Sequence, residues 1–555
     1  MRGKAGTFGG RLAAIGLAAV ICGCGGTLES PRKPYLPPPA TAAVREQPSG
    51  GDEPPAFRAL EGWSWARALD PPERFPTARG PLQERMLGLY PAHRFRLARG
   101  DCADCGPAGA LPRLGEDVVA VPDPAAMPNA ASAGAGTGDV PREASLPPLV
   151  WMGAPQLIEH ATLAPDGRAL TLGGATIPLF VTPKSPTNAA WVDASTVRFF
   201  AHRPIRVRGA THAEGDTTVF VARTLWPEDA RLATDGLPLE PLGRGETLGT
   251  LIEAQASAEG AFAVRLLFER APGARHLAGK PVLAFVLSGA QGDDDGSLAG
   301  HLAVATGILG PRGEWADWIV NNFYPLREPN AKGITPAPVP MDNYLLDLNS
   351  GQLYYRPAYL LVAVLARPRA AQAVQTGLQD TMRRLYCGEM EFDLATMNST
   401  ALSIDPLREL GWRIPRTGPT SRMAGVIAAP LAAIARRRFA TARDAFAMFT
   451  EEKTRLLPRV AFEVAGHDLL YLVGRGNAGA AEDLTPFERH LVEDVDAILF
   501  ARLPQVPSSR RFGTHPIRSL LAYGAELLAD PRHFERAPEA GTADGPAVPA
   551  EACAR

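Results

Sequence analysis

The sequence predicts an α+β protein, and three observations indicate this class. Residues 148–272 contain short runs of β-branched and aromatic residues separated by turn signals. Residues 280–415 combine strand-like apolar runs with a helical stretch, and residues 416–536 follow a mainly helical pattern. Because 555 residues exceed the usual size of one domain, we expect roughly two to four structural units.

Charge and metal-ligand patterns exclude several function classes. A net charge of −2 gives no electrostatic reason to bind nucleic acid, so we expect no such partner. The acidic run Asp293–Asp295 lacks the alternation and the distant glutamate of a calcium loop. His202 and His212 flank a predicted strand with no third ligand nearby, so we interpret them as surface residues. We therefore expect neither a metal nor a cofactor.

The N-terminus is predicted to be a targeting segment over residues 1–23. A basic stretch precedes Leu12–Val20, an apolar core too short to span a bilayer. The sequence Ile21-Cys22-Gly23-Cys24 then resembles a bacterial lipobox, which implies cleavage before Cys24 and lipidation of its thiol. The alternative is an ordinary signal peptide cleaved elsewhere. Gly25 stands where aspartate retains many lipoproteins in the inner membrane, so we expect an anchor in the outer membrane that faces the periplasm.

A tether and a linker are expected to follow the anchor. The proline-rich residues 24–57 cannot form a core, and residues 58–147 are expected to hold short helices and a disordered linker. Cys102 and Cys105 are too few for a structural zinc site, so a local disulfide is the expected state in an oxidising compartment. Residues 537–555 are predicted to be a disordered tail.

The β-rich region 148–272 is predicted to be a β-sandwich or a barrel. Its strand-like runs recur at near-regular spacing and are separated by turn residues. These runs are 169–172, 177–181, 196–200 and 218–222. We expect this domain to act in support or recognition, and the sequence does not distinguish between the two.

The segment 280–415 contains the candidate catalytic residues. Strands are predicted at 281–287, 301–309 and 315–323, and a helix at 360–385. His301 opens the second strand, and Asn398-Ser399-Thr400 precedes a further helix. Unpaired N–H groups at a helix N-terminus stabilise a developing oxyanion, and a nearby imidazole can take the proton of a nucleophile. A side-chain amide on the neighbouring strand, Asn321 or Asn322, could orient the imidazole, but only one of them can face it.

These motifs resemble the DUF4105 group, the N-terminal periplasmic domain of bacterial lipoprotein N-acyltransferases. The matching segments are Gly300-His301, Asp317–Phe323 and Asn398-Ser399-Thr400 with the helix after it, and they cover about residues 290–415. The resemblance implies a permuted papain-like (NlpC/P60) fold. It favours Asn321 as the orienting residue beside His301. The family's cysteine nucleophile is replaced here by Ser399.

Two functions follow from this resemblance. The first is an acyltransferase or an amide or ester hydrolase, with Ser399 as nucleophile, His301 as base and then acid, Asn321 orienting His301, and phospholipid or lipoprotein acyl groups as substrates. The second is a catalytically inactive member that acts as a binding or scaffold lipoprotein, in which Ser399 only caps its helix. A nucleophile relocated to Cys387 is a third alternative, but no matching motif surrounds that residue.

The region 416–536 is predicted to be helical. The expected helices are 422–439, 442–457, 485–501 and 516–528. The weakly polar run Ala424–Ala435 ends at three arginines and is too short to span a bilayer. Two interpretations are open: a helix in a membrane interface with its arginines near phosphate head groups, or an ordinary packed helix with a basic C-terminus.

Overall fold

The fold is known from a computed structural model of the chain. It describes residues 88–90, 94–99, 118–122, 146–147, 149–181, 194–214, 217–232, 236–254, 262–271, 276–290, 300–326, 334–348, 350–436, 439–477, 483–507, 516 and 519. The predicted lipid acceptor Cys24, the predicted disulfide of Cys102 and Cys105, the acidic loop 293–295 and the predicted tail all lie outside these residues. The described part has a mixed α+β fold with several sheets, as the sequence predicts.

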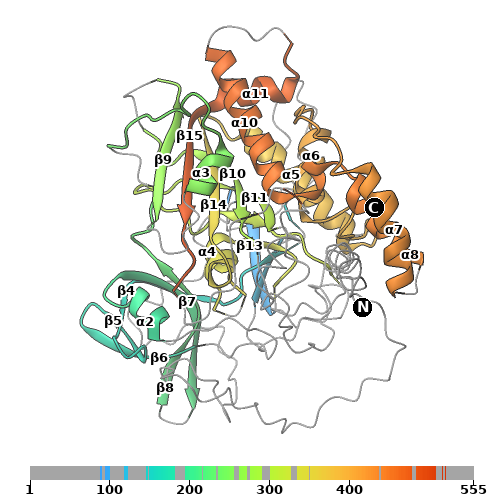
Figure 1. Cartoon of the computed structure of the whole chain (residues 1–555). Coiled ribbons are helices and arrows are strands. Elements are labelled where there is room, and N and C mark those ends of the chain that lie inside the picture. The colour runs from blue at the N-terminus through green and yellow to red at the C-terminus, as the bar shows by residue number, and fades with distance from the viewer. Residues whose placement is uncertain are drawn as a thin grey trace, which may run out of the picture.

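A seven-stranded antiparallel sheet forms the centre of the molecule (Figure 1). Its strands, in the order in which they lie side by side, are β13 (Pro338–Pro340), β12 (Ile319–Asn321), β11 (His301–Ile308), β10 (Pro281–Ser288), β14 (Ala358–Leu365), β15 (Val495–Leu503) and β9 (Ala263–Glu269). Every residue of β14 is buried, because both faces of the sheet are covered. Such a strand is a continuous apolar run rather than an alternating one.

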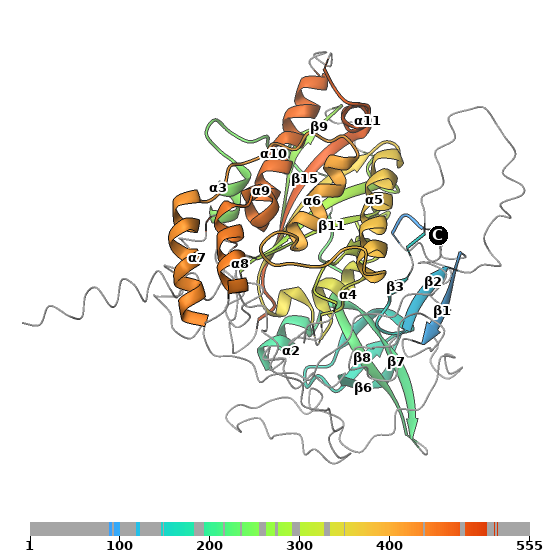
Figure 2. The same ribbon diagram turned by 90° about the vertical axis from the view of Figure 1, so that its right-hand side faces the viewer.

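Helices cover one face of this sheet, which we call the helix face (Figure 2). They are α5 (Arg369–Tyr386), α6 (Ser399–Glu409), α9 (Lys453–Leu456), α10 (Pro458–Asn477) and α11 (Pro486–Asp494), with α3 (Leu248–Ala254) against α10. Side-chain contacts identify the strand positions that point this way. Phe285 of β10 lies 5.9 Å from the Trp412 ring, and Leu361 of β14 lies against Gly466 of α10.

Two further helices form a hairpin at the side of the helix face. They are α7 (Arg422–Arg436) and α8 (Phe439–Thr450), and they pack mainly against each other. The base of this α7–α8 hairpin is joined to the body by a backbone bridge between Pro419 and Glu452 and by a hydrogen bond between the Thr417 and Thr454 hydroxyls. In Figures 1 and 2 the hairpin lies at the outer edge of the molecule.

We call the opposite face of the sheet the barrel face, because helix α4 (Met341–Leu346), which packs on β12 and β13, joins it to a closed β-barrel. Its strands, in order around the barrel, are β4 (Gln156–Leu163), β5 (Ala169–Leu172), β6 (Ala175–Val181), β8 (Thr217–Pro227) and β7 (Pro204–Glu214), with α2 (Ala194–Phe200) beside them. The short helix α4 also packs against β8, and a 3-10 turn, η8 (Gln352–Tyr354), follows it. A small sheet of β1 (Phe95–Arg99), β2 (Val118–Pro122) and β3 (Val150–Trp151) lies near β13.

Buried charges join the barrel to α4. Arg208 of β7 donates to both carboxylate oxygens of Asp342, and neither side chain is exposed to solvent. The Arg206 guanidinium lies 3.4 Å from the same carboxylate and also pairs with Asp317. A buried charge is tolerated only where its partners remain in place, so these contacts fix the barrel to the sheet.

Several predicted elements are wrong in type. The run 196–200, predicted as a strand, lies in α2, with Val197 and Phe200 buried at helical spacing. The predicted helix 360–385 is strand β14 followed by α5. The predicted helix 485–501 is α11 followed by strand β15. A buried strand and a buried helix segment both present unbroken apolar runs, and periodicity alone does not separate them.

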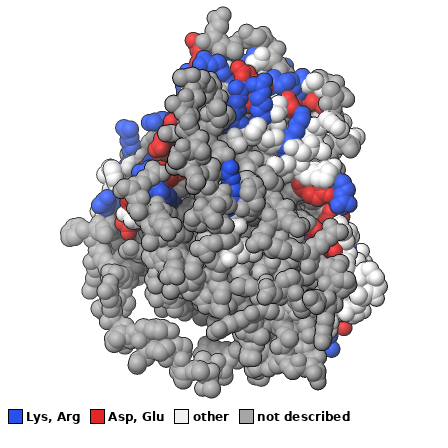
Figure 3. Space-filling view, turned by 180° about the vertical axis from the view of Figure 1, so that it is seen from behind, with Lys and Arg blue, Asp and Glu red and all other residues white. Residues whose placement is uncertain are grey.

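The predicted domain boundaries do not separate structural units, because the central sheet takes strands from all three regions. β9 comes from the region 148–272 and β15 from the region 416–536. The 20-residue helix α10 was not predicted, and the predicted helix 516–528 lies outside the described residues except for 516 and 519. Within the described part, no helix is long and apolar enough to cross a membrane. Figure 3 shows basic and acidic side chains close to one another on the rear face.

Candidate functional site

His301 occupies the position predicted for it, the first residue of β11. Gly300 precedes it with φ +94°, and a Cβ atom there would lie 2.6 Å from the Ser288 carbonyl oxygen, so only glycine fits. The His301 side chain is 3% exposed. Its Nε2 lies 3.0 Å from the Oδ1 of Asn322.

The amide of Asn322 fixes the tautomer of this histidine. Asn322 Nδ2 donates to the Thr335 carbonyl at 2.8 Å, which leaves Oδ1 to accept from His301 Nε2–H. Burial and, to a lesser extent, the nearby Arg356 guanidinium lower the pKa of His301 to about 3, although the Asn322 hydrogen bond opposes both effects. The imidazole is therefore neutral near pH 7.

Two tyrosines enclose the imidazole. The Tyr324 ring centroid lies 5.0 Å from that of His301, and the Tyr344 centroid lies 6.3 Å away. Tyr344 belongs to α4, and its hydroxyl lies 3.5 Å from Ser288 Oγ, on the strand residue paired with His301. The side chains around His301 are thus those of the barrel face.

Asn321, the residue predicted to orient His301, faces the other way. Its amide exchanges hydrogen bonds of 3.1 Å with Gln375 of α5 and donates to the Val304 carbonyl at 3.2 Å. Gln375 also accepts from Thr306 at 2.5 Å. The prediction of Asn321 as the orienting residue is therefore wrong, and Asn322 takes that position. Alternation along β12 allows only one of the two side chains to reach each face.

Ser399 is the first residue of α6, as predicted, but it is not the N-cap. Asn398 is the cap, because its side chain accepts from the backbone N–H groups of Thr400 at 2.9 Å and Ala401 at 3.2 Å. Ser399 itself is 8% exposed. The alternative in which Ser399 serves as the cap is also wrong.

The structure does not bring His301 and Ser399 together. In the register of β10 and β11, His301 pairs with Ser288 on the barrel face, whereas Thr306 of β11 points to Gln375 on the helix face. Helix α6 packs against α5 and β11 on the helix face (Figure 2). The His301 side chain thus points to the barrel face, whereas α6, which carries Ser399, lies on the helix face. Among the hydrogen bonds of the described residues, none joins the two side chains, and the imidazole is bonded to Asn322.

Cys387 does not supply a nucleophile. It is the residue after α5, and its sulfur is in a disulfide whose partner lies outside the described residues. A disulfide sulfur has no thiolate with which to attack a carbonyl.

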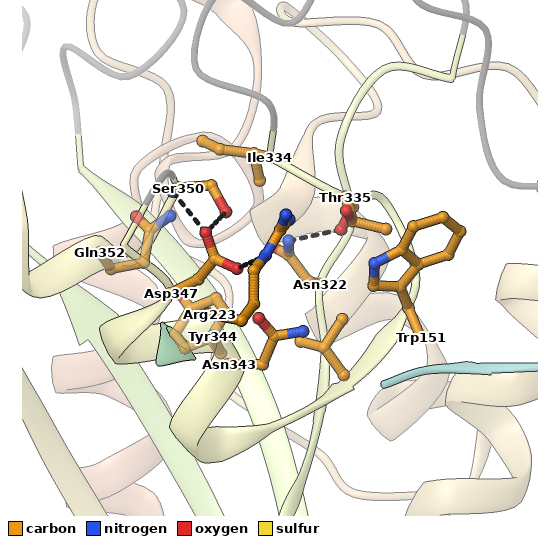
Figure 4. Close-up of a pocket in the computed structure, with 11 residues that line it drawn as sticks. Trp151, Arg223, Asn322, Ile334, Thr335, Asn343, Tyr344, Asp347, Ser350 and Gln352 are labelled. Carbon is orange, nitrogen blue, oxygen red and sulfur yellow. Dashed lines mark hydrogen bonds and ion pairs between the residues drawn. The ribbon is translucent and has the colours of Figure 1, made fainter. Parts of the chain in front are cut away.

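A small polar pocket lies where the barrel and α4 meet the end of β12 (Figure 4). Two of its lining residues, Asn322 and Tyr344, also contact His301. The lining residues are Trp151, Arg223, Asn322, Ile334, Thr335, Val339, Asn343, Tyr344, Asp347, Ser350 and Gln352. Arg223 is paired with Asp347, whose carboxylate also accepts from the Ser350 backbone N–H at 2.8 Å. Sequence reasoning missed this site because its residues come from distant segments that share no local motif.

The chemistry of this pocket is that of hydrogen bonding. Its amides, hydroxyl groups and one internally compensated ion pair could hold a neutral polar group, and Trp151 and Tyr344 provide apolar surface. Within the described residues, no group of three histidine, cysteine or acidic side chains could hold a metal ion.

The chain was compared with family models, curated proteins and solved structures, and no significant match was found in any of the three.

Proposed function

We propose that this chain is a bacterial cell-envelope lipoprotein that acts by binding rather than by catalysis. The lipobox-like Ile21-Cys22-Gly23-Cys24 and the proline-rich segment after it support a lipid anchor on Cys24 with a body held away from the membrane. This proposal locates the body in the periplasm, attached to the outer membrane.

The observation that carries the proposal is the separation of His301 and Ser399 by the central sheet. A serine hydroxyl is not appreciably ionised near pH 7, so it needs a base within hydrogen-bond reach throughout its attack. His301 is bonded to Asn322 beneath two tyrosines, and α6 lies on the other face. This arrangement does not supply that base.

The polar pocket beside His301 is our proposed ligand site. A neutral polar ligand suits it, because Arg223 and Asp347 already compensate each other and leave no net charge to pair. The side chains of Asn322 and Asn343 stand at its wall, where they can offer both donors and acceptors.

The alternative is the acyltransferase or hydrolase of the DUF4105-type, permuted papain-like fold, acting on phospholipid or lipoprotein acyl groups. Its support is the order of the motifs and the position of Ser399 at a helix N-terminus. For this reaction the His301 imidazole and the Ser399 hydroxyl would have to lie on the same face of the sheet. A packed core opposes the rearrangement that this requires.

A labelling experiment separates the two functions. The full chain, Ser399→Ala and His301→Ala are treated with a fluorophosphonate probe, and we expect equal background labelling of all three. Labelling that is lost in both variants would overturn the binding proposal in favour of the enzyme. Ser399→Cys provides a second readout, because thiol-dependent ester hydrolysis by that variant would show that a base reaches residue 399.

The anchor is tested separately. Cells that express the full chain are fed an alkyne-bearing fatty acid, and we expect label on the wild-type chain but not on Cys24→Ser. Equal label on both chains, or on neither, would contradict the anchor without bearing on catalysis.

A further inference from the structure

The large exposed apolar side chains of the described residues are concentrated on the α7–α8 hairpin. Four of the six lie there: Met423 at 77% exposure, Val426 at 63%, Ile427 at 59% and Phe446 at 44%. Single exposed apolar residues are ordinary, but a cluster on one element marks an interaction surface.

The spacing of these residues defines an outer face of the hairpin. Met423, Val426 and Ile427 are three and four residues apart, so they share one side of α7. Phe446 of α8 lies beside α7, because its ring is 3.4 Å from the position of a Cβ on Gly425. Met423, Val426 and Ile427 therefore form an exposed apolar patch on α7, and Phe446 adds an exposed apolar side chain on the adjacent helix.

The inner face of α7 is already occupied, so the patch is not a core that has lost its partner within the chain. Ala424 and Ala428 pack with Ala445 and Phe449 of α8. On α7 only small residues make this contact, while its larger side chains Met423, Val426 and Ile427 are exposed. This distribution is the reverse of the one in an ordinary packed helix.

The charges beside the patch are basic. Arg422 is exposed one turn before Val426, and Arg443 is exposed one turn before Phe446. Asp444 is the sole acidic residue in the two helices, and the pKa of its carboxyl is raised by burial and by Asp393 of the body. It therefore lies toward the body rather than among the exposed side chains.

We propose that this outer face of the α7–α8 hairpin binds the surface of an anionic phospholipid bilayer. An apolar side flanked by arginines is the pattern of a helix that lies in a membrane interface, with its cations at the phosphate groups. The hairpin lies at the outer edge of the described body (Figures 1 and 2), and its apolar side chains are exposed to solvent. The inference does not rest on the anchor at Cys24 or on the function of the polar pocket.

Hydrogen exchange on the full chain carrying Cys24→Ser tests this contact directly. Vesicles of equal parts phosphatidylglycerol and phosphatidylcholine are compared with vesicles of phosphatidylcholine alone. We expect slowed exchange in peptides from residues 422–450 with the anionic vesicles and a smaller effect with the neutral ones. Unchanged exchange in these peptides on bound anionic vesicles would overturn the proposal.

Vesicle sedimentation of variants gives the second test. The apolar leader is common to all variants, so differences between them report on the hairpin. We expect the double change Val426→Glu and Ile427→Glu to weaken partitioning about tenfold or more, because two apolar side chains no longer enter the interface. Arg422→Gln and Arg443→Gln should each weaken it roughly fivefold at low salt.

Tyr471→Glu is the matched control, because Tyr471 is 60% exposed on α10, away from the hairpin. It should partition as the parent chain does. Equal partitioning of the hairpin double variant and this control would contradict the proposal. So would dimers that form without vesicles and are lost in the double variant, because the patch would then cover a second copy of the chain.

Discussion

The two faces of the central sheet carry two polar clusters that differ by one residue of register. On the helix face, Asn321 bonds with Gln375. On the barrel face, its neighbour Asn322 bonds with His301. A histidine on one strand and an asparagine on the next give the same sequence pattern whichever face of the sheet each side chain points to. The comparison teaches that order and spacing of catalytic-type residues do not establish a site until the face of each strand position is known.

The largest expected effect on stability comes from removing a buried charge at the junction of the barrel and α4. Asp342→Ala leaves Arg208 buried without its partner, so we expect a loss of about 3–5 kcal/mol in the free energy of unfolding. Urea unfolding of both chains measures it. Glu314→Ala is the control: it breaks an ion pair with Arg312, which is 57% exposed, and should cost at most about 1 kcal/mol. Equal losses would show that the junction does not rely on Asp342.

The neutral state of His301 should make the barrel face sensitive to acid. The folded pKa of about 3 lies below the unfolded value of about 6.5, so the unfolded chain binds the extra proton as pH falls through this window. Stability is therefore lost on acidification, by about 2 kcal/mol between pH 7 and pH 5 from this residue.

His301→Gln isolates that contribution, because glutamine does not titrate. We expect the free energy of unfolding of the wild-type chain to fall by about 2 kcal/mol more than that of the variant between pH 7 and pH 5. The measurement is urea unfolding at both pH values. Parallel pH profiles for the two chains would mean that His301 is accessible to protons in the folded state.

On the helix face, Asn398 and Ser399 should differ in their effect on stability. Asn398→Ala removes the cap of α6 and should cost about 1–2 kcal/mol, whereas Ser399→Ala should change the free energy of unfolding by less than about 0.5 kcal/mol. Thermal or urea unfolding compares them. A larger loss for Ser399→Ala than for Asn398→Ala would reverse the assignment of the cap.

The smallest effect concerns the proton of the His301 ring, and it tests the register itself. Asn322→Leu removes the acceptor that holds the ring proton on Nε2, so the population of the Nδ1–H tautomer should rise. Asn321→Leu should leave the tautomer unchanged, because only Asn322 reaches the ring. Nitrogen-15 chemical shifts of the imidazole report the tautomer. A change in tautomer caused by Asn321→Leu alone would show that Asn321, not Asn322, orients the imidazole.

The sequence predicted the strands nearest the candidate residues well. Runs such as Pro281–Leu287 and His301–Leu309 are bounded by glycine, polar residues or proline, and they correspond to β10 and β11. The start of α6 was also predicted, because Asn398 and Ser399 are strong cap-region residues before an apolar run. These features are local, so a single sequence contains them.

The predictions that were wrong or missing depend on interactions between distant segments of the chain. Ala358–Leu365 looks like the beginning of a helix until one knows that β10 and β15 flank it. The pairing of Arg223 with Asp347 joins residues far apart in the chain. Whether Asn321 or Asn322 faces His301 depends on the pairing of β11 with β12, which alternation alone does not specify.

The position of β15 in the sheet has a consequence for how the chain is made. This strand, residues 495–503, lies between β14 and β9, which the ribosome completes much earlier. Until β15 emerges, β14 lacks a neighbour on one side and β9 has no partner in this sheet. Completion of the sheet must therefore wait until residues 495–503 have been synthesised.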